Sequence, residues 1–196
     1  MKKMIFTTLL IVFCCLSLSA QKKQAGLADE EYAMLSSILD GISVIENKTI
    51  PARIFADSKE GNSFDGNVSI FRLREAMPNL SDETVKDFNS KNDKEYALEK
   101  KFNINGEYEL ISDDEISKIF YKAENLEKAW ESFRKKYPKS GGFVQFSRVG
   151  FSSDKKQAVI YFTYSCGSLC ASGDFIFYVK EKEKWVEKGK VNLWVS

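Results

Sequence analysis

The pattern of apolar and polar positions divides the chain into a helical first part and a strand-rich last part. Between Phe143 and Val195, runs of β-branched and aromatic residues alternate with short polar connections, as in an antiparallel β-meander. The two most strand-like runs are Gln157–Ser165 and Asp174–Glu181. Between their polar ends both are apolar at nearly every position, so we expect them to lie inside a sheet that is covered on both faces.

Further strands are expected before and after this pair. A proline at position 51 would place one of them at a sheet edge, because proline lacks the amide hydrogen that a central strand needs. A polar stretch rich in glycine and asparagine, Asp57–Asn67, is expected to be a loop. The additional predicted strands are Thr49–Phe55, Val68–Leu73, Phe143–Phe151, Trp185–Lys188 and Lys190–Val195.

Helical periodicity predicts two main amphipathic helices, Ala28–Ile42 and Glu124–Tyr137, the second ended by Pro138. Shorter helices are expected to begin at Ser81 and to span Lys94–Phe102. Ser112 starts a Ser-x-x-Glu capping box, a further helix start. These elements predict an α+β fold in which N-terminal helices pack on a C-terminal antiparallel β-meander. Two apolar residues of the second main helix are expected to be buried against the sheet: Trp130 and Phe133.

Residues 1–20 have the pattern of a cleaved signal peptide. Lys2 and Lys3 precede the apolar run Met4–Leu16, which is too short to span a bilayer, and Ser17–Ala20 supplies small residues for cleavage before Gln21. We therefore expect a single α+β domain over residues 21–196, exported to the periplasm or the exterior. No transmembrane segment is expected after cleavage.

A lipoprotein signal is the alternative interpretation of this segment, with Cys14 or Cys15 as the acylated residue. It is disfavoured because Phe13 or Cys14 would then stand where a small residue is expected.

Charge and composition exclude several classes of function. The chain has 29 basic and 28 acidic side chains, and this balance argues against a nucleic-acid partner, which would need a basic face. It has no histidine, so Ser-His-Asp and Cys-His catalysis and His-ligated metal sites are excluded. No cofactor and no metal site are predicted.

Cys166 and Cys170 are the two cysteines that remain after signal cleavage, and an even pair in an exported protein is expected to form a disulfide. Glycine and serine around them give the turn the freedom to close so short a ring. The candidate ligand loop consists of Gly167, Ser168, Gly173 and Asp174. A redox-active pair is the alternative, although known redox motifs use C-x-x-C at a helix N-terminus.

Carboxylates are the remaining source of acid–base chemistry. The cluster Asp113, Asp114 and Glu115 is explained by helix capping, and the acidic residues of the Glu124–Tyr137 helix by a solvated face. A hydrolase would need two carboxylates at a set separation across a cleft, which the sequence does not reveal.

The last fifty residues carry a recognisable series of motifs. They are an S-R-V-G-F strand from Ser147, a D-x-x-Q-A turn from Asp154, a C-G-x-L-C-x-x-G loop from Cys166, and a K-W strand ending in a tryptophan. Ser147–Ser196 thereby resembles the C-terminal region of a family of uncharacterised exported bacterial proteins, and the likeness extends more loosely back through Trp130. The resemblance implies one domain and export, and it implies no activity.

Three hypotheses follow for the function. The leading one, reached by exclusion, is a non-catalytic binding or structural module of the cell envelope or exterior. Its partner would be a protein, peptide or glycan, bound through the sheet or the Cys166–Cys170 loop. The second is a thiol–disulfide redox protein that uses Cys166 and Cys170. The third is a carboxylate-dependent hydrolase.

Overall fold

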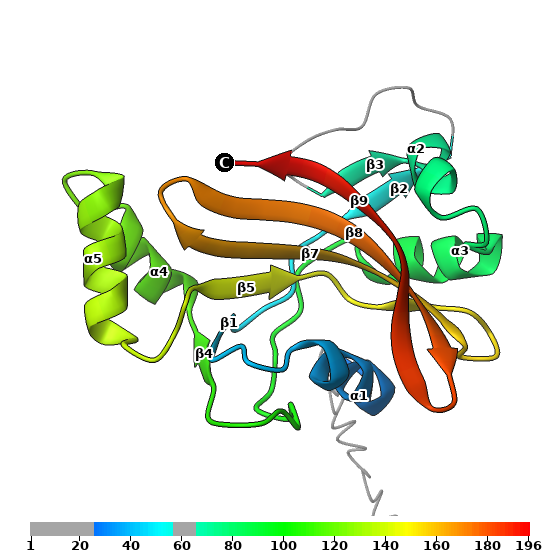
Figure 1. Ribbon diagram of the computed structural model, residues 1–196, viewed down its shortest axis with the longest axis horizontal. Helices are drawn as coiled ribbons and strands as arrows, with labels where there is room; N and C mark the ends of the chain where they lie inside the picture. The colour runs from blue at the N-terminus through cyan, green and yellow to red at the C-terminus, as the bar shows by residue number, and fades with distance from the viewer. Residues whose placement is uncertain (1–25, 57–65) are drawn as a thin grey trace, which may run out of the picture.

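The computed structural model describes residues 26–56 and 66–196. Within these ranges the chain forms five helices and nine strands, and the α+β class is confirmed (Figure 1). The expected signal peptide and most of the expected loop Asp57–Asn67 lie outside the described residues. In the described ranges, no helix has both the length and the apolar character needed to cross a bilayer.

The main sheet is mixed, because a parallel part adjoins the expected antiparallel meander. Its strand order is β4-β1-β5-β7-β8-β9, with β6 also paired to β7. β1 is parallel to both of its neighbours, and β5, β7, β8 and β9 are antiparallel to one another. The meander is thus confirmed, while the parallel strands extend it. The strands are β1 (Val44–Glu46), β4 (Glu109–Ile111), β5 (Phe143–Phe146), β6 (Gly150–Phe151), β7 (Gln157–Gly167), β8 (Cys170–Glu181) and β9 (Lys184–Val195).

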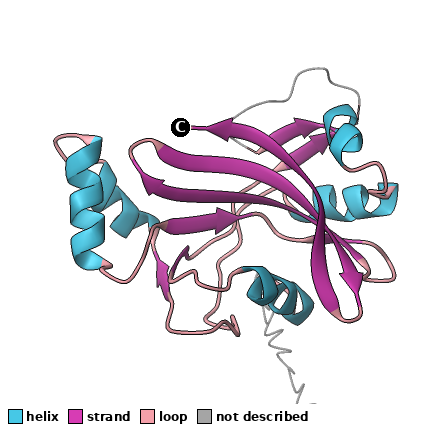
Figure 2. Ribbon diagram, viewed as in Figure 1, coloured by secondary structure: helices cyan, strands magenta, loops and turns pink. Residues whose placement is uncertain are grey.

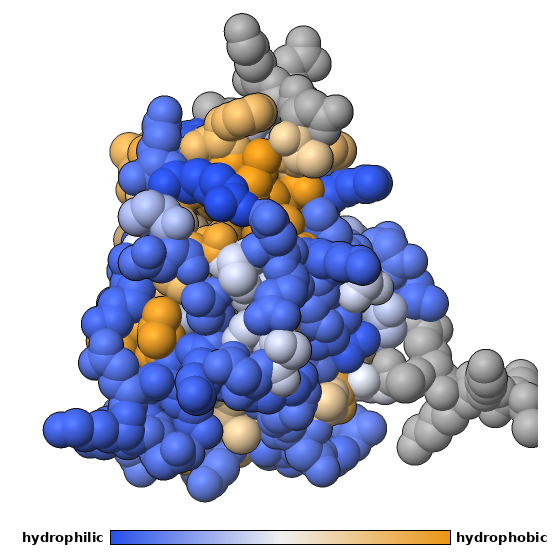
Figure 3. All heavy atoms as spheres, turned by 90° about the vertical axis from the view of Figure 1, so that its right-hand side faces the viewer, coloured by the Kyte–Doolittle hydropathy of each residue, from blue (hydrophilic) through white to orange (hydrophobic). Residues whose placement is uncertain are grey.

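The remaining elements surround this sheet (Figure 2). Two short parallel strands, β2 (Arg53–Phe55) and β3 (Asn67–Ser69), form a separate small sheet. On the side of the molecule that carries α2 and α3 the surface is largely hydrophilic, and apolar atoms gather at its upper end (Figure 3). The helices are α1 (Asp29–Ile38), α2 (Ile70–Ala76), α3 (Asp82–Lys91), α4 (Asp113–Phe120) and α5 (Leu126–Lys136).

Both faces of the central strands are covered, as the continuous apolar runs predict. Along β7, Ala158 and Ile160 pack in one cluster with Leu35 of α1. The alternate residues Val159 and Tyr161 pack in a second cluster under α2, α3 and the small sheet. Helices therefore cover both faces of the sheet, whereas a single covered face is the simpler expectation for an α+β protein.

A third cluster lies under α4 and α5, at the end of the sheet where the parallel strands begin. Trp130 is only 3% exposed, and its ring stacks on Phe143 of β5 with ring centres 6.0 Å apart. Phe133 is fully buried in the same cluster. The predicted burial of both residues is confirmed.

The predicted helix Lys94–Phe102 is wrong. This segment is extended, because its backbone bonds to the chain that follows β1: the Thr49 amide donates to the Tyr96 carbonyl at 2.8 Å, and the Leu98 amide to the Asn47 carbonyl at 2.7 Å. These tertiary hydrogen bonds replace those that a helix would make.

The predicted strand Val68–Leu73 is wrong beyond Ser69. The Ser69 hydroxyl accepts a hydrogen bond from the Phe71 amide at 3.3 Å and caps α2, which begins at the next residue.

Three other boundaries differ from the prediction. The first helix ends at Ile38, three residues before Gly41, whose φ is +78°. The predicted strand Phe143–Phe151 is divided into β5 and β6. The two predicted C-terminal strands are one, β9, in which Gly189 packs against the Ala76 carbonyl beside a bulge.

Candidate functional site

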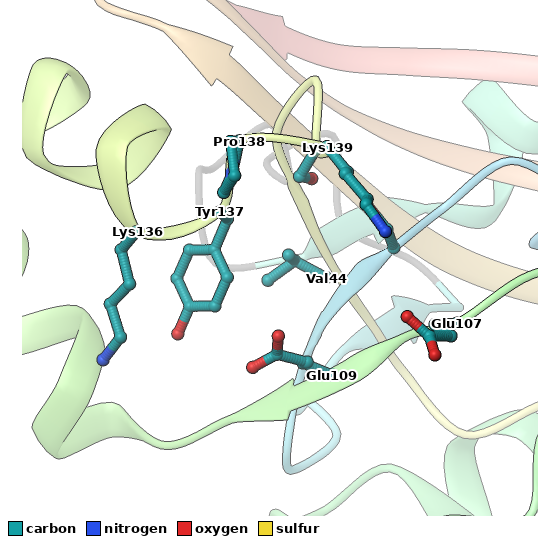
Figure 4. A pocket seen from close by; sticks show the side chains of 9 residues that line it. Val44, Glu107, Glu109, Lys136, Tyr137, Pro138 and Lys139 are labelled. Atoms are coloured by element: carbon teal, nitrogen blue, oxygen red, sulfur yellow. The ribbon is translucent and has the colours of Figure 1, made fainter.

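A pocket of ≈ 220 Å³ opens where β1 and β4 meet the chain that leaves α5 (Figure 4). Three segments far apart in the sequence build it: the start of β1, the approach to β4, and the connection from α5 to β5. Nine residues line it: Ser43, Val44, Glu107, Glu109, Lys136, Tyr137, Pro138, Lys139 and Ser140.

The sheet and the end of α5 fix the walls of this pocket. The parallel register pairs Val44 with Glu109, so an apolar and an acidic side chain lie side by side. Val44 is buried, and in Figure 4 Tyr137 and Glu109 point toward one another near it. Tyr137 follows the last turn of α5, where its amide donates to the Phe133 carbonyl at 2.8 Å, and Pro138 prevents the helix from continuing.

Tyr137 is held in place by α4. Its hydroxyl donates to the Glu115 carboxylate, which also forms an ion pair with Lys136. Burial, and then the neighbouring Glu115, raise the pKa of Tyr137 well above its usual range. Lys136, and then Tyr137, lower the pKa of Glu115. At neutral pH the hydroxyl therefore keeps its proton and Glu115 stays an anion.

Glu107 and Glu109 are the free charges of the pocket. Both are exposed, and within residues 26–56 and 66–196 neither forms an ion pair. Lys139 descends from the opposite wall toward the strand that carries Glu107 (Figure 4). The pocket thus combines an apolar floor, an aromatic wall and two carboxylates, with one lysine facing them.

A second carboxyl pair, one buried and one exposed, lies at the other end of β1. Glu46 is 4% exposed, and its carboxyl group receives a hydrogen bond from the Gln145 side-chain amide. It is also hydrogen bonded to Asp113, the first residue of α4. Lys48 contacts Asp113 at 2.5 Å and Glu95 at 2.7 Å.

The two carboxyl groups titrate differently. Burial, and then the hydrogen bond to Asp113, raise the pKa of Glu46 to about 7. The hydrogen bond from Glu46, and then the ammonium of Lys48, lower the pKa of Asp113. Below about pH 7 one proton is therefore held on Glu46 and donated to Asp113.

This pair belongs to a polar row that crosses three strands on one face of the sheet. Gln145 on β5 lies beside Glu46, and the Thr163 hydroxyl on β7 lies 3.4 Å from the Gln145 side-chain oxygen. By strand alternation, Phe143 and Val44 on this face belong to the cluster under α5, and Tyr161 to the cluster under α3. The row therefore separates two apolar clusters on the same face.

The predicted disulfide is present between Cys166 and Cys170, whose Cα atoms are 5.1 Å apart. A two-residue turn, Ser168-Leu169, joins β7 to β8 at this point. The Ser168 hydroxyl hydrogen bonds to Glu127 in the first turn of α5. The disulfide loop and the pocket therefore lie at opposite ends of α5.

The other two residues of the predicted ligand loop lie within β8. Asp174 is buried, and it accepts hydrogen bonds from Ser172 at 3.0 Å and Asn192 at 2.9 Å and pairs with Lys190 at 3.2 Å. Gly173 packs directly against Trp194. The structure brings Gly167 and Ser168 together at the turn and places Asp174 in the hydrogen-bond network of the sheet.

Sequence reasoning missed both the pocket and the carboxyl pair. The Ser112 hydroxyl does cap α4, accepting from the Glu115 amide at 3.3 Å, as its motif predicts. The motif did not indicate that the Asp113 side chain is also hydrogen bonded to Glu46. Glu107 and Glu109 lie in no motif, and the alternation of charged and aromatic residues in Glu107-Tyr108-Glu109 was the one signal in the sequence.

Metal binding has no support among the described residues. They contain no group of three or more acidic, cysteine or histidine side chains placed to hold a metal ion.

Comparison with known proteins gives a partial similarity. No known family profile matches the chain, and no solved structure matches it. Over 104 residues the chain is 33% identical to Charged multivesicular body protein 6 of Dictyostelium discoideum. The matched segment makes up 53% of this chain and 48% of that protein. The chain thus spans about half the length of the curated relative that it matches.

Proposed function

We propose that the chain is an exported, non-catalytic binding module whose ligand site is the pocket between β1, β4 and the end of α5. The observation that carries this proposal is a concave site with a buried floor and two unpaired carboxylates. Strand β1 and helix α5 supply its walls, so the site is pre-formed, as binding sites usually are.

Export is supported by the sequence of the first twenty residues, with Lys2 and Lys3 ahead of a short apolar run and a small-residue cleavage site. The disulfide between Cys166 and Cys170 is compatible with an oxidising compartment.

The chemistry of the pocket favours binding over catalysis. The Tyr137 hydroxyl already donates to Glu115, and the pKa shifts of this pair move both groups away from neutrality. The Ser140 hydroxyl donates to the Gly142 carbonyl. Within the described part of the chain, the other two hydroxyls that line the pocket, those of Ser43 and Ser140, are not hydrogen bonded to a carboxylate.

Acid–base catalysis is the second candidate, and the pair Glu46–Asp113 is the observation that favours it. Two carboxyl groups that share a proton are the arrangement used by enzymes that need one acid and one base. It ranks second because Glu46 is buried and does not line the pocket, so a substrate bound there would not reach it.

The proposal is tested by NMR titration of the isotope-labelled protein with a mixed library of anionic, neutral and cationic small molecules and short peptides. We expect at least one class to shift the amide signals of Val44 and Tyr137. The variant Ser43→Trp fills the pocket without changing its charge, and it should abolish those shifts while the melting temperature stays the same. A library with no effect on these signals would refute the proposal.

A further inference from the structure

The pocket adjoins an unpaired sheet edge. β4 is the outermost strand of the main sheet, next to β1 alone (Figure 1). Glu109 and Ile111 direct their backbone groups toward β1: the Glu109 amide donates to the Ser43 carbonyl at 2.9 Å, and the Ile111 carbonyl accepts from Asn47 at 2.8 Å. Backbone groups alternate in direction along a strand, so those of Leu110 point away from the sheet. Such an edge can accept an extended peptide as an added strand.

The same edge carries the free negative charge. Glu107 and Glu109 are two residues apart in extended chain, with the buried Tyr108 between them, so their carboxylates project from the same face about 7 Å apart. A peptide strand added beside β4 would place every second side chain over this face. An acidic side chain there would be repelled, and a neutral one would leave both carboxylates unpaired.

The apolar part of the pocket fits the stem of a long cationic side chain. Val44 forms the floor, and the Tyr137 ring and Pro138 form a wall. Lysine and arginine bury their methylene stems along such surfaces and keep the charged end near water. A cation in this position would lie between an aromatic ring and two carboxylates.

The side-chain ammonium of Lys139 would compete with such a ligand. It lies on the opposite wall of the pocket and carries the same positive charge toward Glu107 and Glu109. Lys136, in contrast, is already paired with Glu115.

We infer that the pocket receives the side chain of a lysine or arginine residue from an extended peptide that pairs with the free edge of β4. This inference rests on the proposed function and names the ligand class of the same site. It combines backbone pairing at Leu110, charge pairing at Glu107 and Glu109, and apolar contact at Val44 and Tyr137.

The test uses four capped pentapeptides, acetyl-Ser-Val-X-Val-Ser-amide, in which X is lysine, arginine, norleucine or glutamate. Binding is measured by NMR titration and by calorimetry at low salt. We expect the lysine and arginine peptides to bind, and to bind differently enough to identify the preferred cation. Each exposed charge pair is worth up to about fivefold in affinity, and the norleucine peptide forms neither pair, so it should bind roughly tenfold more weakly. The glutamate peptide should not bind.

Three variants of the protein separate the contributions of the two carboxylates and of Lys139 to the peptide affinity. The double variant Glu107→Gln/Glu109→Gln should lower the affinity for the lysine peptide by roughly tenfold. Lys139→Gln should raise it, because the competing ammonium is removed. Glu124→Gln removes one carboxylate at an exposed residue outside the pocket, as each half of the double variant does inside it, and should have no effect.

A separate ligand tests how much backbone pairing with the edge of β4 contributes to the peptide affinity. Nα-acetyl-lysine methylamide keeps the side-chain ammonium but lacks the flanking residues that would pair with β4. We expect it to bind at least tenfold more weakly than the lysine pentapeptide. Equal binding by the two would overturn the pairing with β4. Equal binding of the norleucine and lysine peptides would overturn the cation site. If library ligands shift Val44 and Tyr137 while no cationic peptide does, the inference fails and the binding function stands.

Discussion

Arg148 holds the carboxylate of Glu31 with two of its nitrogen atoms, Nη2 at 2.6 Å and Nε at 3.2 Å. Glu31 is fully buried on α1, and the Val149 amide also donates to it at 3.2 Å. The guanidinium lies over the Tyr96 ring at 4.6 Å. This single side chain therefore joins α1, the extended segment after α3, and the chain between β5 and β6.

Removing the cation of this pair should be strongly destabilising. We expect Arg148→Met to lower the free energy of unfolding by about 3–5 kcal/mol, because it leaves the Glu31 carboxylate buried without its partner. Urea unfolding at pH 7 measures the change. Glu131→Gln removes one partner of the exposed pair Lys128–Glu131 and should change stability by less than about 1 kcal/mol. A similar loss in both variants would contradict the central role of Arg148.

Glu46→Gln should stabilise the protein at alkaline pH and have little effect in acid. The folded protein holds the Glu46 proton up to about pH 7, whereas an unfolded glutamate loses it near the ordinary glutamate pKa of 4.5. Native protein thus binds more protons in this window, and the contribution of Glu46 to stability falls as pH rises through it. Glutamine cannot ionise, so the variant avoids the loss.

The expected gain for Glu46→Gln at pH 8 is at most about 3 kcal/mol, at about 1.4 kcal/mol per pKa unit, and it should vanish near pH 4. Thermal unfolding at pH 4, 6 and 8 measures it. Glu124→Gln, at an exposed position, should show no trend with pH. A gain that is the same at every pH would show that the effect comes from packing.

Replacing both Cys166 and Cys170 by serine should lower the free energy of unfolding by about 2 kcal/mol at most, because the disulfide closes a very short loop. Ligand binding at the pocket should survive, since the loop lies at the other end of α5. Titration against a glutathione series measures the reduction potential. A potential well above about −300 mV, together with binding that depends on the oxidation state, would favour the redox hypothesis.

Gly173→Ala should be destabilising by about 1–3 kcal/mol, the usual cost of overpacking. A methyl group there would overlap the Trp194 indole nitrogen and come within 2.6 Å of the Tyr161 hydroxyl, two groups that are hydrogen bonded to each other. Gly167→Ala is the matched control, because its nearest neighbour would be the Cys170 Cβ at 3.4 Å. Thermal unfolding of both variants compares them, and equal losses would contradict the close packing at Trp194.

Mass spectrometry of the native protein should find an N-terminus at or near Gln21 and no acyl chain. The charged start, the short apolar run and the small residues of Ser17–Ala20 motivate this expectation. A lipid on Cys14 or Cys15 would establish the lipoprotein alternative, and an intact N-terminus would argue against export.

The parts of the fold that could be predicted are those specified by nearby residues. The stripe that includes Trp130 and Phe133 identified α5, and the long apolar runs identified β7 and β8. The three-residue strands β1 and β4 are too short for a periodic pattern, and distant partners hold them in the sheet. The helix predicted over Lys94–Phe102 is wrong for the same reason, since hydrogen bonds to Asn47 and Thr49 determine the conformation of this segment.

The candidate site was less predictable than the fold. Glu46 lies in no motif, between the apolar Val44-Ile45 and the polar Asn47-Lys48, and its hydrogen-bond partner Gln145 lies 99 residues away. The raised pKa of Glu46 comes from burial and from Asp113, neither of which is visible in the local sequence. The cysteine pair could be predicted because its chemistry depends on two residues of one turn.

The mixed topology of the sheet has a consequence for how the chain folds. Turns of two residues join β7 to β8 and β8 to β9, and Lys182 and Glu183 in the second turn both have positive φ, as the tightest hairpins require. Such local pairings form within microseconds, whereas the contact of Glu46 with Gln145 must first close a loop of 99 residues. We expect the antiparallel half to form early and to serve as the template on which β1 and then β4 dock. The ligand pocket, which needs both of these strands and α5, is then the last part of the molecule to assemble.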